Sequence, residues 1–362
     1  MANINADVNQ FPSLTWNHLN INRTHLNASI EEGAALSVLH LPEGIELSRK
    51  TLADSYGNDQ HIETGLGKEF DRQYDRAVFE AGILVHEFYV KSSSSIPVRI
   101  SYSAEGGKSC TGDNIIIHAS SGTESTFILD FSSALEADGD YGLRIRIFAD
   151  SSATVHLITV NMLSGLHKDF LSLGSAIEDN ACIDVVQLEL GGGTVCSGSY
   201  HNLKGYKSAV KSNVCYVVNE NHSLDMNYVA RQTGRETESF MRTDGVVMDS
   251  ASKVWRGTID FVKGCKESKG DEQEDVLLLN PDVVNKTLPV ILCDEEAVEG
   301  RHGSSIGRLG KDILFYMQSR GVDEETARKL MIKAKISSTC KRIPDQDLVS
   351  QIKNFVEGAF TK

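Results

Sequence analysis

The segment from Leu277 to Gly321 concentrates the residue types that could carry out chemistry. Within ten positions it holds a cysteine, four carboxylates, an arginine and a histidine, namely Cys293, Asp294, Glu295, Glu296, Glu299, Arg301 and His302. A buried polar group needs a partner, so an ordinary core segment would not contain this many of them so close together. The cluster is therefore either a solvated turn or a functional site.

His302 is the member of this cluster best suited to bind a ligand. Its neighbours Gly300, Gly303 and Ser304 are small and leave the imidazole accessible, while the nearby carboxylates can orient the ring and keep one nitrogen available. Cys293 lies nine residues upstream, a spacing that could return the chain to the same edge of a coil. A thiolate and an imidazole together suit iron or zinc. These residue types predict a metal site at His302 and Cys293, with a solvated turn as the alternative.

The elements that would position this site are short strands. From residue 83 onward the chain alternates β-branched or apolar segments with Ser, Gly, Asp and Asn clusters, and from Ala181 to Cys293 the segments recur about every ten residues. Such a pattern without long helical crossovers is typical of a sandwich, a barrel or a β-solenoid. A jelly-roll sandwich would need longer antiparallel strands and hairpin signals, which are scarce. We therefore expect a mainly β protein built as a solenoid, in which equivalent strands of successive coils pair.

Three regions follow from these patterns. Residues 1–95 are expected to form an N-terminal mixed and helical cap, turn-rich around Asn17, Asn20, Asn22 and Asn27 and helical from Phe70 to Phe79. Residues 96–309 are expected to form the β-helix core. Residues 310–362 are expected to form a C-terminal helical domain of three helices. The first would end at Gly321, the second would be capped by Asp323, and the third would begin at Pro344.

Composition excludes several classes of function. A formal net charge of −14 without a basic stripe argues against nucleic acid, and no apolar run approaches the length of a membrane span. Seven cysteines without a C-x-x-C pair predict free thiols in a reducing compartment, and the start lacks a secretory pattern, so a cytoplasmic location is expected. GGKSC at Gly106 to Cys110 lacks the first glycine of a phosphate-binding loop, because Tyr102 occupies that position. We expect a surface turn there and no bound nucleotide.

The same residues carry a family resemblance. The sequence from Trp255 to Ala334, which includes WRGTIDFVKGC, LLLNPDVVNKTLPVILC, GRHG and FYMQSRG, resembles the C-terminal signature of the SufB/SufD proteins of the SUF iron-sulfur cluster assembly system. The resemblance implies a right-handed parallel β-helix flanked by N- and C-terminal helical parts. It also implies a scaffold subunit without enzymatic turnover of its own.

Partners and cargo are likewise implied by the resemblance. Such a subunit pairs through its β-helix with a SufB-type paralogue or with a second copy, its helical C-terminal domain docks a SufC-type ATPase, and the assembly builds or transfers a nascent cluster. A transient iron-sulfur cluster or iron is therefore expected at a subunit interface. Aromatic and arginine side chains dominate interface energies, which makes Phe315, Tyr316 and Arg320 the expected ATPase anchors. The alternative is that these three residues pack the tail onto the β body.

The resemblance is greatest to SufD. SufB proteins carry a scaffold cysteine shortly before a T-F-P segment, whereas here the segment is TLP at Thr287 to Pro289 and the preceding DVVNK has no cysteine. The functional histidine of SufD proteins maps onto His302. Some SufD proteins also have a cysteine two residues earlier, where this chain has Gly300, which leaves Cys293 as the nearest substitute.

Other functions stay open at this point. One is a SufB-like homodimer that itself holds the nascent cluster, and another is a purely structural partner whose complex performs its chemistry elsewhere. A third is a carbohydrate-active β-helix enzyme with paired carboxylates in a groove. The expected cytoplasmic location and an aromatic content of 7% argue against that enzyme. Whether a flavin binds is also open.

Overall fold

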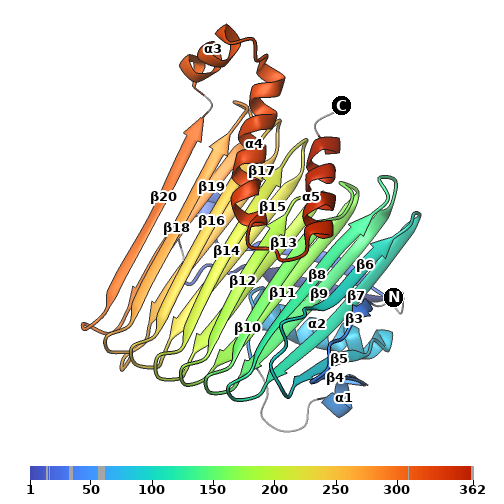
Figure 1. The fold of residues 1–362 in the computed structure, drawn as a ribbon, viewed down its shortest axis with the longest axis vertical. Helices are drawn as coiled ribbons and strands as arrows, with labels where there is room; N and C mark the ends of the chain where they lie inside the picture. Colours follow the sequence, from blue (N-terminus) through green and yellow to red (C-terminus); the bar gives the residue numbers. More distant parts are fainter. Residues whose placement is uncertain (14, 16, 32–35, 56–61, 309, 360–362) are drawn as a thin grey trace.

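The computed structural model describes residues 1–362 except residues 14, 16, 32–35, 56–61, 309 and 360–362. Two nine-stranded sheets face each other, and from β5 onward successive strands alternate between them (Figure 1). This arrangement is a parallel β-solenoid of about eight turns, which confirms the predicted fold class. Each strand pairs with the strand two further along the chain, so every coil contributes one strand to each sheet.

We call the two layers sheet 1 and sheet 2. Sheet 1 contains β4 (Ile45–Lys50), β5 (Val85–Val90), β7 (Lys108–Ala119), β9 (Asp138–Ala149), β11 (His167–Ile177), β13 (Thr194–Leu203), β15 (Ser223–Gln232), β17 (Ser252–Phe261) and β19 (Val284–Cys293). Sheet 2 contains β3 (Ser37–His40), β6 (Val98–Ala104), β8 (Glu124–Ser133), β10 (Thr154–Met162), β12 (Cys182–Glu189), β14 (Ala209–Val218), β16 (Glu238–Val247), β18 (Lys269–Leu278) and β20 (Glu299–Arg308).

The two ends of the solenoid differ. At the N-terminal end β4 and β3 pair antiparallel with β5 and β6, so an antiparallel strand closes each sheet. At the other end β19 pairs only with β17, and β20 pairs only with β18, among the described strands. Between the sheets a large apolar cluster fills the space that we call the lumen. No further described coil covers the C-terminal end of the lumen, which we call the open end.

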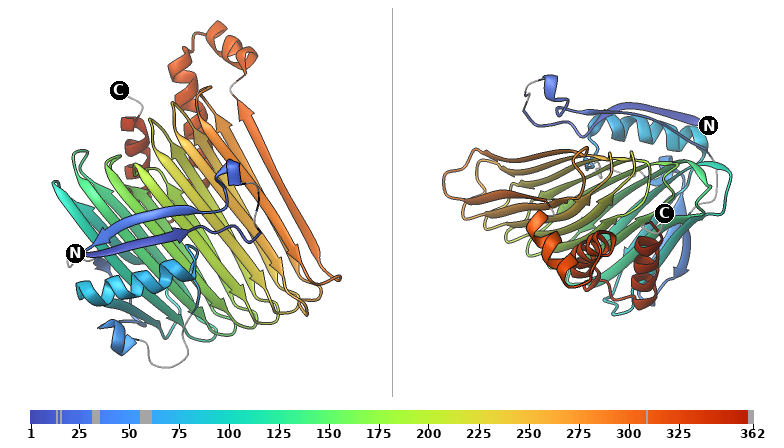
Figure 2. Two further views of the ribbon diagram at one scale, coloured as in Figure 1. Left: turned by 180° about the vertical axis from the view of Figure 1, so that it is seen from behind. Right: turned by 90° about the horizontal axis from the view of Figure 1, so that it is seen from above.

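The N-terminal residues cover the outer face of sheet 1 (Figure 2). A hairpin of β1 (Ala2–Val8) and β2 (Thr24–Ile30) lies there with η1 (Asn17–Leu19), and α1 (Leu52–Ser55) and α2 (Lys68–Ala81) follow. The expected helix around Phe70 to Phe79 is confirmed by α2. The expected turn at Asn27 is wrong, because Asn27 pairs with Asn5 in the middle of the hairpin. Its side chain lies on the solvent-facing side of an alternating strand, where asparagine is tolerated.

A buried ion pair anchors this hairpin to the solenoid. Arg256 of β17 donates to Asp225 of β15 at 2.7 Å and to the carbonyl oxygen of Ile21 at 2.7 Å. Asn9 donates to the same Asp225 carboxylate at 2.6 Å. The N-terminal segment therefore supplies hydrogen-bond partners for charges on the outer face of sheet 1, as buried charges require.

The C-terminal helices lie on the opposite side, over sheet 2. They are α3 (Lys311–Ser319), α4 (Glu324–Cys340) and α5 (Gln346–Ala359). Two expected boundaries are confirmed: Gly321 has φ +85°, and the Asp323 carboxylate accepts the Thr326 N–H at 2.8 Å. The expected start of the third helix at Pro344 is two residues too early, because the Asp345 carboxylate accepts the Leu348 N–H at 2.9 Å and the helix begins at Gln346. Helices α4 and α5 bury an apolar stripe against the outer face of sheet 2, with Ile332, Ile336, Leu348 and Ile352 at its centre. Helix α3 contacts α4 and projects beyond the strand ends (Figure 1).

His156 of β10 gives sheet 2 a pH-dependent contribution to stability. Its ring nitrogens lie 3.5 Å from Asp184 and 3.2 Å from Glu124, and these carboxylates raise the pKa of the imidazole, Asp184 most strongly. A raised folded pKa stabilises the fold below the unfolded pKa, and this contribution is lost as pH rises through the folded value. We expect His156→Gln to lower the melting temperature at about pH 5.5 and to leave it nearly unchanged at about pH 9. If His156→Gln lowered the melting temperature by the same amount at both pH values, this assignment would be contradicted.

Candidate functional site

The cluster singled out by its chemistry lies at the open end of the solenoid. Strands β19 and β20 and the turn between them form the last coil, and most residues of β20 are exposed. Cys293 is the final residue of β19, and His302 lies in the first half of β20. Because each strand has a paired neighbour on one side only, the last coil presents two free sheet edges and an uncovered lumen.

His302 belongs to the lumen side of sheet 2. It is in register with Glu272 of β18, whose side chain is fully buried between the sheets. In-register residues of parallel strands share a face, so the His302 side chain lies on the lumen face. It is nevertheless exposed, because no further coil covers it. The structure thus gives this histidine an inward-facing position that a partner can reach.

Cys293 is the last residue of β19, at the turn that leads into the β20 strand of His302. It is in register with buried Phe261, but its thiol donates to the carbonyl oxygen of Glu295 in the turn at 3.1 Å. A Cβ on Gly300 would stand 3.0 Å from both Ile291 and Phe261, so an apolar layer lies at this level of the last coil. Among the described residues, no three His, Cys, Asp or Glu side chains gather as a metal site. Metal binding by His302 and Cys293 stays a prediction.

A buried ion pair lies beneath the last coil. The Lys253 ammonium of β17 is 2.5 Å from the Glu274 carboxylate of β18, and both side chains are completely inaccessible to solvent. Tyr216 donates to Glu274 at 2.8 Å, and Thr287 of β19 donates to it at 2.5 Å. Burial lowers the pKa of Lys253 to about 8, against the opposing effect of Glu274. Every oxygen of Glu274 therefore has a donor, as a buried carboxylate requires.

Glu272, two residues earlier on β18, is in a different situation. Neither of its carboxyl oxygens has a hydrogen-bond partner at normal distance, although the Val290 N–H lies near enough to favour the ionised form slightly. Burial, followed by the charge of Glu274, raises the pKa of Glu272 to about 9. A buried and unpartnered carboxyl is costly to the fold. Glu272 is thus the unusual polar group directly beneath His302.

Sequence reasoning missed Lys253, Glu272 and Glu274. The expected site was confined to Cys293 and His302, whereas β18 extends from Lys269 to Leu278 and carries both glutamates. The available signal was spacing: Glu272 and Glu274 are two residues apart, like Lys253 and Trp255, which places each pair on one face of a strand. Only the strand pairing shows that the β18 face with Glu272 and Glu274 and the β17 face with Lys253 both point into the lumen.

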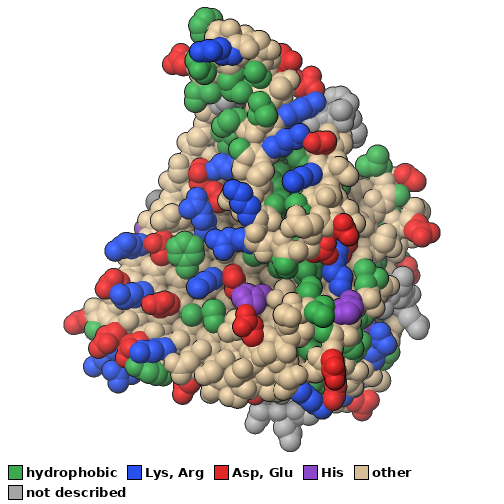
Figure 3. All heavy atoms as spheres, viewed as in Figure 1, with side chains coloured by type: hydrophobic (Ala, Val, Ile, Leu, Met, Phe, Trp, Pro, Cys, Tyr) green, Lys and Arg blue, Asp and Glu red, His purple; other side chains and the backbone are tan. Residues whose placement is uncertain are grey.

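The expected docking residues lie on or beside α3. Phe315 and Tyr316 are 73% and 60% exposed, and the Arg320 guanidinium stands 5.5 Å from the centroid of the Tyr316 ring. Figure 3 shows hydrophobic side chains gathered on this helix at the top of the molecule. Exposure of this degree does not fit packing of Phe315 and Tyr316 onto the β body. Partner binding at these residues stays a prediction.

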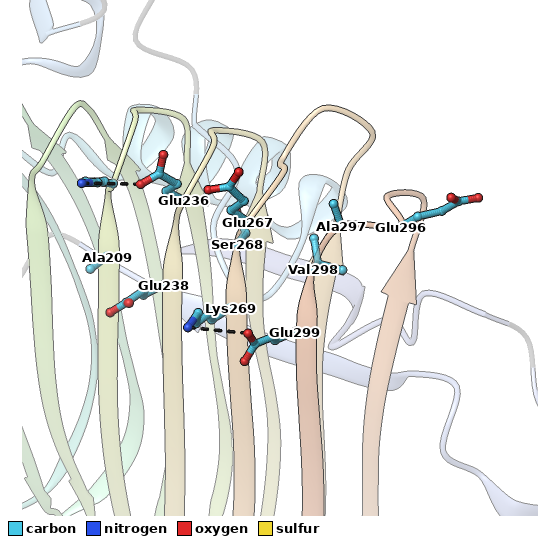
Figure 4. A pocket seen from close by; sticks show the side chains of 11 residues that line it. Ala209, Glu236, Glu238, Glu267, Ser268, Lys269, Glu296, Ala297, Val298 and Glu299 are labelled. Atoms are coloured by element: carbon cyan, nitrogen blue, oxygen red, sulfur yellow. Dashed lines mark ion pairs between the residues drawn. The ribbon is translucent and has the colours of Figure 1, made fainter.

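A surface groove of about 840 Å³ runs along the coil corners near the turn of the last coil (Figure 4). Its carboxylates are partly paired with lysines: Lys207 with Glu236 at 3.5 Å, and Lys269 with Glu299 at 3.7 Å. None of the described residues that line the groove is aromatic. Sugar-binding grooves depend on aromatic platforms, so this groove gives little support to a carbohydrate-active enzyme.

The described helices include none that is long and apolar enough to cross a membrane.

Residues 102–335 match the family model for the SufBD core domain of the SUF system for FeS cluster assembly. The chain is 22% identical to the iron-sulfur cluster assembly protein SufD of Bacillus subtilis over 263 residues, which are 72% of this chain and 60% of that protein. It is 22% identical to SufD of Escherichia coli over 231 residues, 64% of this chain and 55% of that protein.

A SufBD family protein of Pyrococcus horikoshii is 30% identical over 136 residues, which are 38% of this chain and 30% of that protein. The chain therefore spans 60% or less of the length of each of these relatives.

Proposed function

Because the chain belongs to the SufBD family of iron-sulfur cluster assembly proteins, we propose that it acts as a SufD-like subunit of a SUF scaffold complex. The observation that carries this proposal is the open end of the solenoid, where His302 faces an uncovered lumen between two free sheet edges. The relatives named SufD support the choice within the family. So does the absence of a cysteine in the residues just before Thr287.

The proposed partner at the open end is a SufB-type paralogue, with a second copy of this chain as the alternative. Strands β19 and β20 each present a ten-residue edge. Such edges invite pairing with another chain, and proteins usually cover or interrupt them. A second solenoid that adds its own strands to both edges would satisfy these backbone groups and cover the lumen.

The proposed cargo is a transient iron-sulfur cluster or iron at that interface. His302 offers an accessible imidazole nitrogen, and Cys293 on the same coil offers a thiol. Since the described residues of this chain do not provide three convergent ligands, the proposed site is completed by the partner. All seven cysteines are unpaired, which agrees with the reducing cytoplasm proposed as the location.

ATP hydrolysis is assigned to a SufC-type partner that docks at the C-terminal helices. The exposed face of α3 with Phe315, Tyr316 and Arg320 supports this part of the proposal. The Gly106–Gly107 turn leads directly into β7 rather than into a helix, so it lacks the helix N-terminus on which a phosphate-binding loop relies. We therefore propose that this chain binds no nucleotide and catalyses no reaction by itself.

Co-expression with a SufC-type ATPase and a SufB-type scaffold, followed by anaerobic iron and sulfide analysis of the purified complex, tests the proposal. A complex that contains all three chains and accumulates iron and sulfide supports it. If this chain purifies alone as a dimer that holds iron and sulfide, the SufB-like homodimer is the correct function. If it neither joins a complex nor affects cluster content, the proposed function is wrong.

His302→Ala is expected to reduce the rate of cluster formation on the reconstituted complex by at least about 10-fold, because an imidazole ligand or proton carrier would be lost at the interface. The matched control is His25→Ala, which removes another exposed histidine, on the N-terminal hairpin. An unchanged rate for His302→Ala would exclude His302 from the site. Retained assembly of the complex would show that only the chemistry had been affected.

A further inference from the structure

Glu272 occupies a position at which an apolar residue would make the fold more stable. Its side chain is fully buried, and its carboxyl lacks normal hydrogen-bond partners, whereas Glu274 on the same strand has Lys253, Tyr216 and Thr287. Replacing an unsatisfied buried polar group by an apolar group of the same shape is usually neutral or stabilising. Residues that break such local rules are expected at functional positions. Folding alone therefore does not explain Glu272.

The surroundings of Glu272 make room for its carboxyl. Gly257 lies opposite on sheet 1, and a Cβ there would stand 2.2 Å from a carboxyl oxygen of Glu272. Any other residue at Gly257 would therefore displace the carboxyl. The nearby Val290 N–H belongs to the last coil, so the carboxyl lies at the level between the last two coils. It is held beside the last coil rather than deep in the solenoid.

Among the described histidines, His302 is the one whose position on the neighbouring strand pairs with Glu272. Glu272 and His302 are direct partners on adjacent parallel strands, about 4.8 Å apart in the pairing direction, and both side chains lie on the lumen face. In this structure the Glu272 carboxyl is packed beside Gly257 and makes no hydrogen bond to His302, so their contact requires the Glu272 side chain to turn toward β20. Histidines that bind metals almost always donate their second ring N–H to a carboxylate, a backbone carbonyl or a water molecule, and this contact fixes the tautomer and the ring orientation.

We propose that Glu272 is the positioning residue for His302: its carboxyl accepts one ring N–H and leaves the other ring nitrogen facing the open end, where cargo is handed to the partner. This inference rests on the proposed function of the open end. It adds Glu272 to the site, on β18, the strand next to the exposed edge strand β20. No bond to iron is assigned to Glu272 itself.

The test uses three variants of the full chain. Glu272→Met removes the acceptor and keeps the volume, whereas Glu272→Gln keeps an acceptor oxygen. Glu299→Gln is the matched control, because Glu299 is an exposed carboxylate three residues before His302 and therefore on the opposite face of β20. Melting temperatures check folding. Glu272→Met is expected to melt at the same temperature as the wild type or higher.

The first measurement is the ring nitrogen chemical shifts of ¹⁵N-labelled histidines at about pH 8, well above the pKa of free histidine. The signals of His302 are identified by their loss in His302→Ala. One predominant tautomer is expected in the wild type, in Glu272→Gln and in Glu299→Gln, and a mixture like that of free histidine in Glu272→Met. If His302 in the wild type shows the mixture of tautomers that free histidine has, the inference is overturned without any variant. The same tautomer in Glu272→Met and in the wild type also overturns it.

The second measurement is anaerobic Fe²⁺ binding by the complex with the ATPase and the SufB-type scaffold. Loss of the positioning contact is expected to weaken Fe²⁺ binding by about 10- to 100-fold in Glu272→Met. A smaller effect is expected in Glu272→Gln and none in Glu299→Gln. If His302→Ala weakens binding and Glu272→Met does not, the positioning role is wrong and the proposed function stands. If His302→Ala has no effect on binding, the proposed site itself is wrong.

Discussion

Replacing Lys253 by methionine is expected to lower the free energy of unfolding by about 3–5 kcal/mol, because it removes one partner of a buried ion pair. Lys253 and Glu274 have no solvent exposure, and their charged groups are 2.5 Å apart. Without the ammonium, Glu274 stays buried with only the hydroxyls of Tyr216 and Thr287 as donors. Glu272 lies two residues away and adds a second carboxyl to the same part of the lumen. Chemical unfolding followed by circular dichroism measures the loss.

A double variant separates the charge effect from simple loss of packing. Lys253→Met combined with Glu274→Leu removes both charges and is expected to recover most of the stability, since a buried pair replaced by apolar residues of similar volume is often neutral or stabilising. The exposed pair Lys269 and Glu299 offers a matched control, for which Lys269→Met should change stability by less than about 1 kcal/mol. A loss below about 1 kcal/mol for Lys253→Met itself would show that water enters this end of the lumen.

The second large effect is expected at α3. Phe315→Ala should weaken binding of the SufC-type ATPase by at least about 30-fold, which corresponds to about 2 kcal/mol and is the usual size of a hot-spot contribution. Phe315 is 73% exposed in this chain, so its truncation should leave the melting temperature unchanged. An effect on binding without an effect on stability is the signature of an interface residue. Titration of the purified ATPase by calorimetry measures it.

Phe79 provides the control for nonspecific hydrophobic contacts. It is 69% exposed on α2, on the face of sheet 1 that lies away from the C-terminal helices (Figure 2). Phe79→Ala should therefore leave ATPase binding unchanged. A truncation that ends after Gly310 should abolish binding. If the truncated chain still captures the ATPase, docking occurs on another surface and the role given to α3 is wrong.

Much of the fold was accessible from local patterns. The short strands with polar turns predicted the solenoid, because each coil repeats the same alternation of strand and corner. The helix boundaries at Gly321 and Asp323 were predicted correctly because a left-handed glycine and an N-cap carboxylate act on backbone groups only a few residues away. The motif between Trp255 and Ala334 pointed to the family that the comparison confirms.

Errors arose where distant contacts override local preference. The hairpin of β1 and β2 was mistaken for turn-rich sequence, because its asparagines are tolerated only through the cover that sheet 1 gives the other face. The buried face of β18 was not predicted, because Glu274 is compatible with a buried strand only when Lys253 of β17 lies against it. In both cases the partner that makes the strand possible lies far away in sequence or on another strand.

The sequence by itself determined that this chain forms a parallel β-solenoid of the SufBD family and that Cys293 and His302 lie near its end, because strand spacing and short motifs are local properties. Only the tertiary structure decided that His302 faces the lumen and lies directly above Glu272. These two residues are 30 positions apart in the chain, and their alignment depends on the lengths of all the turns in one coil. A shift of one residue in that register would turn His302 to the opposite face of the sheet.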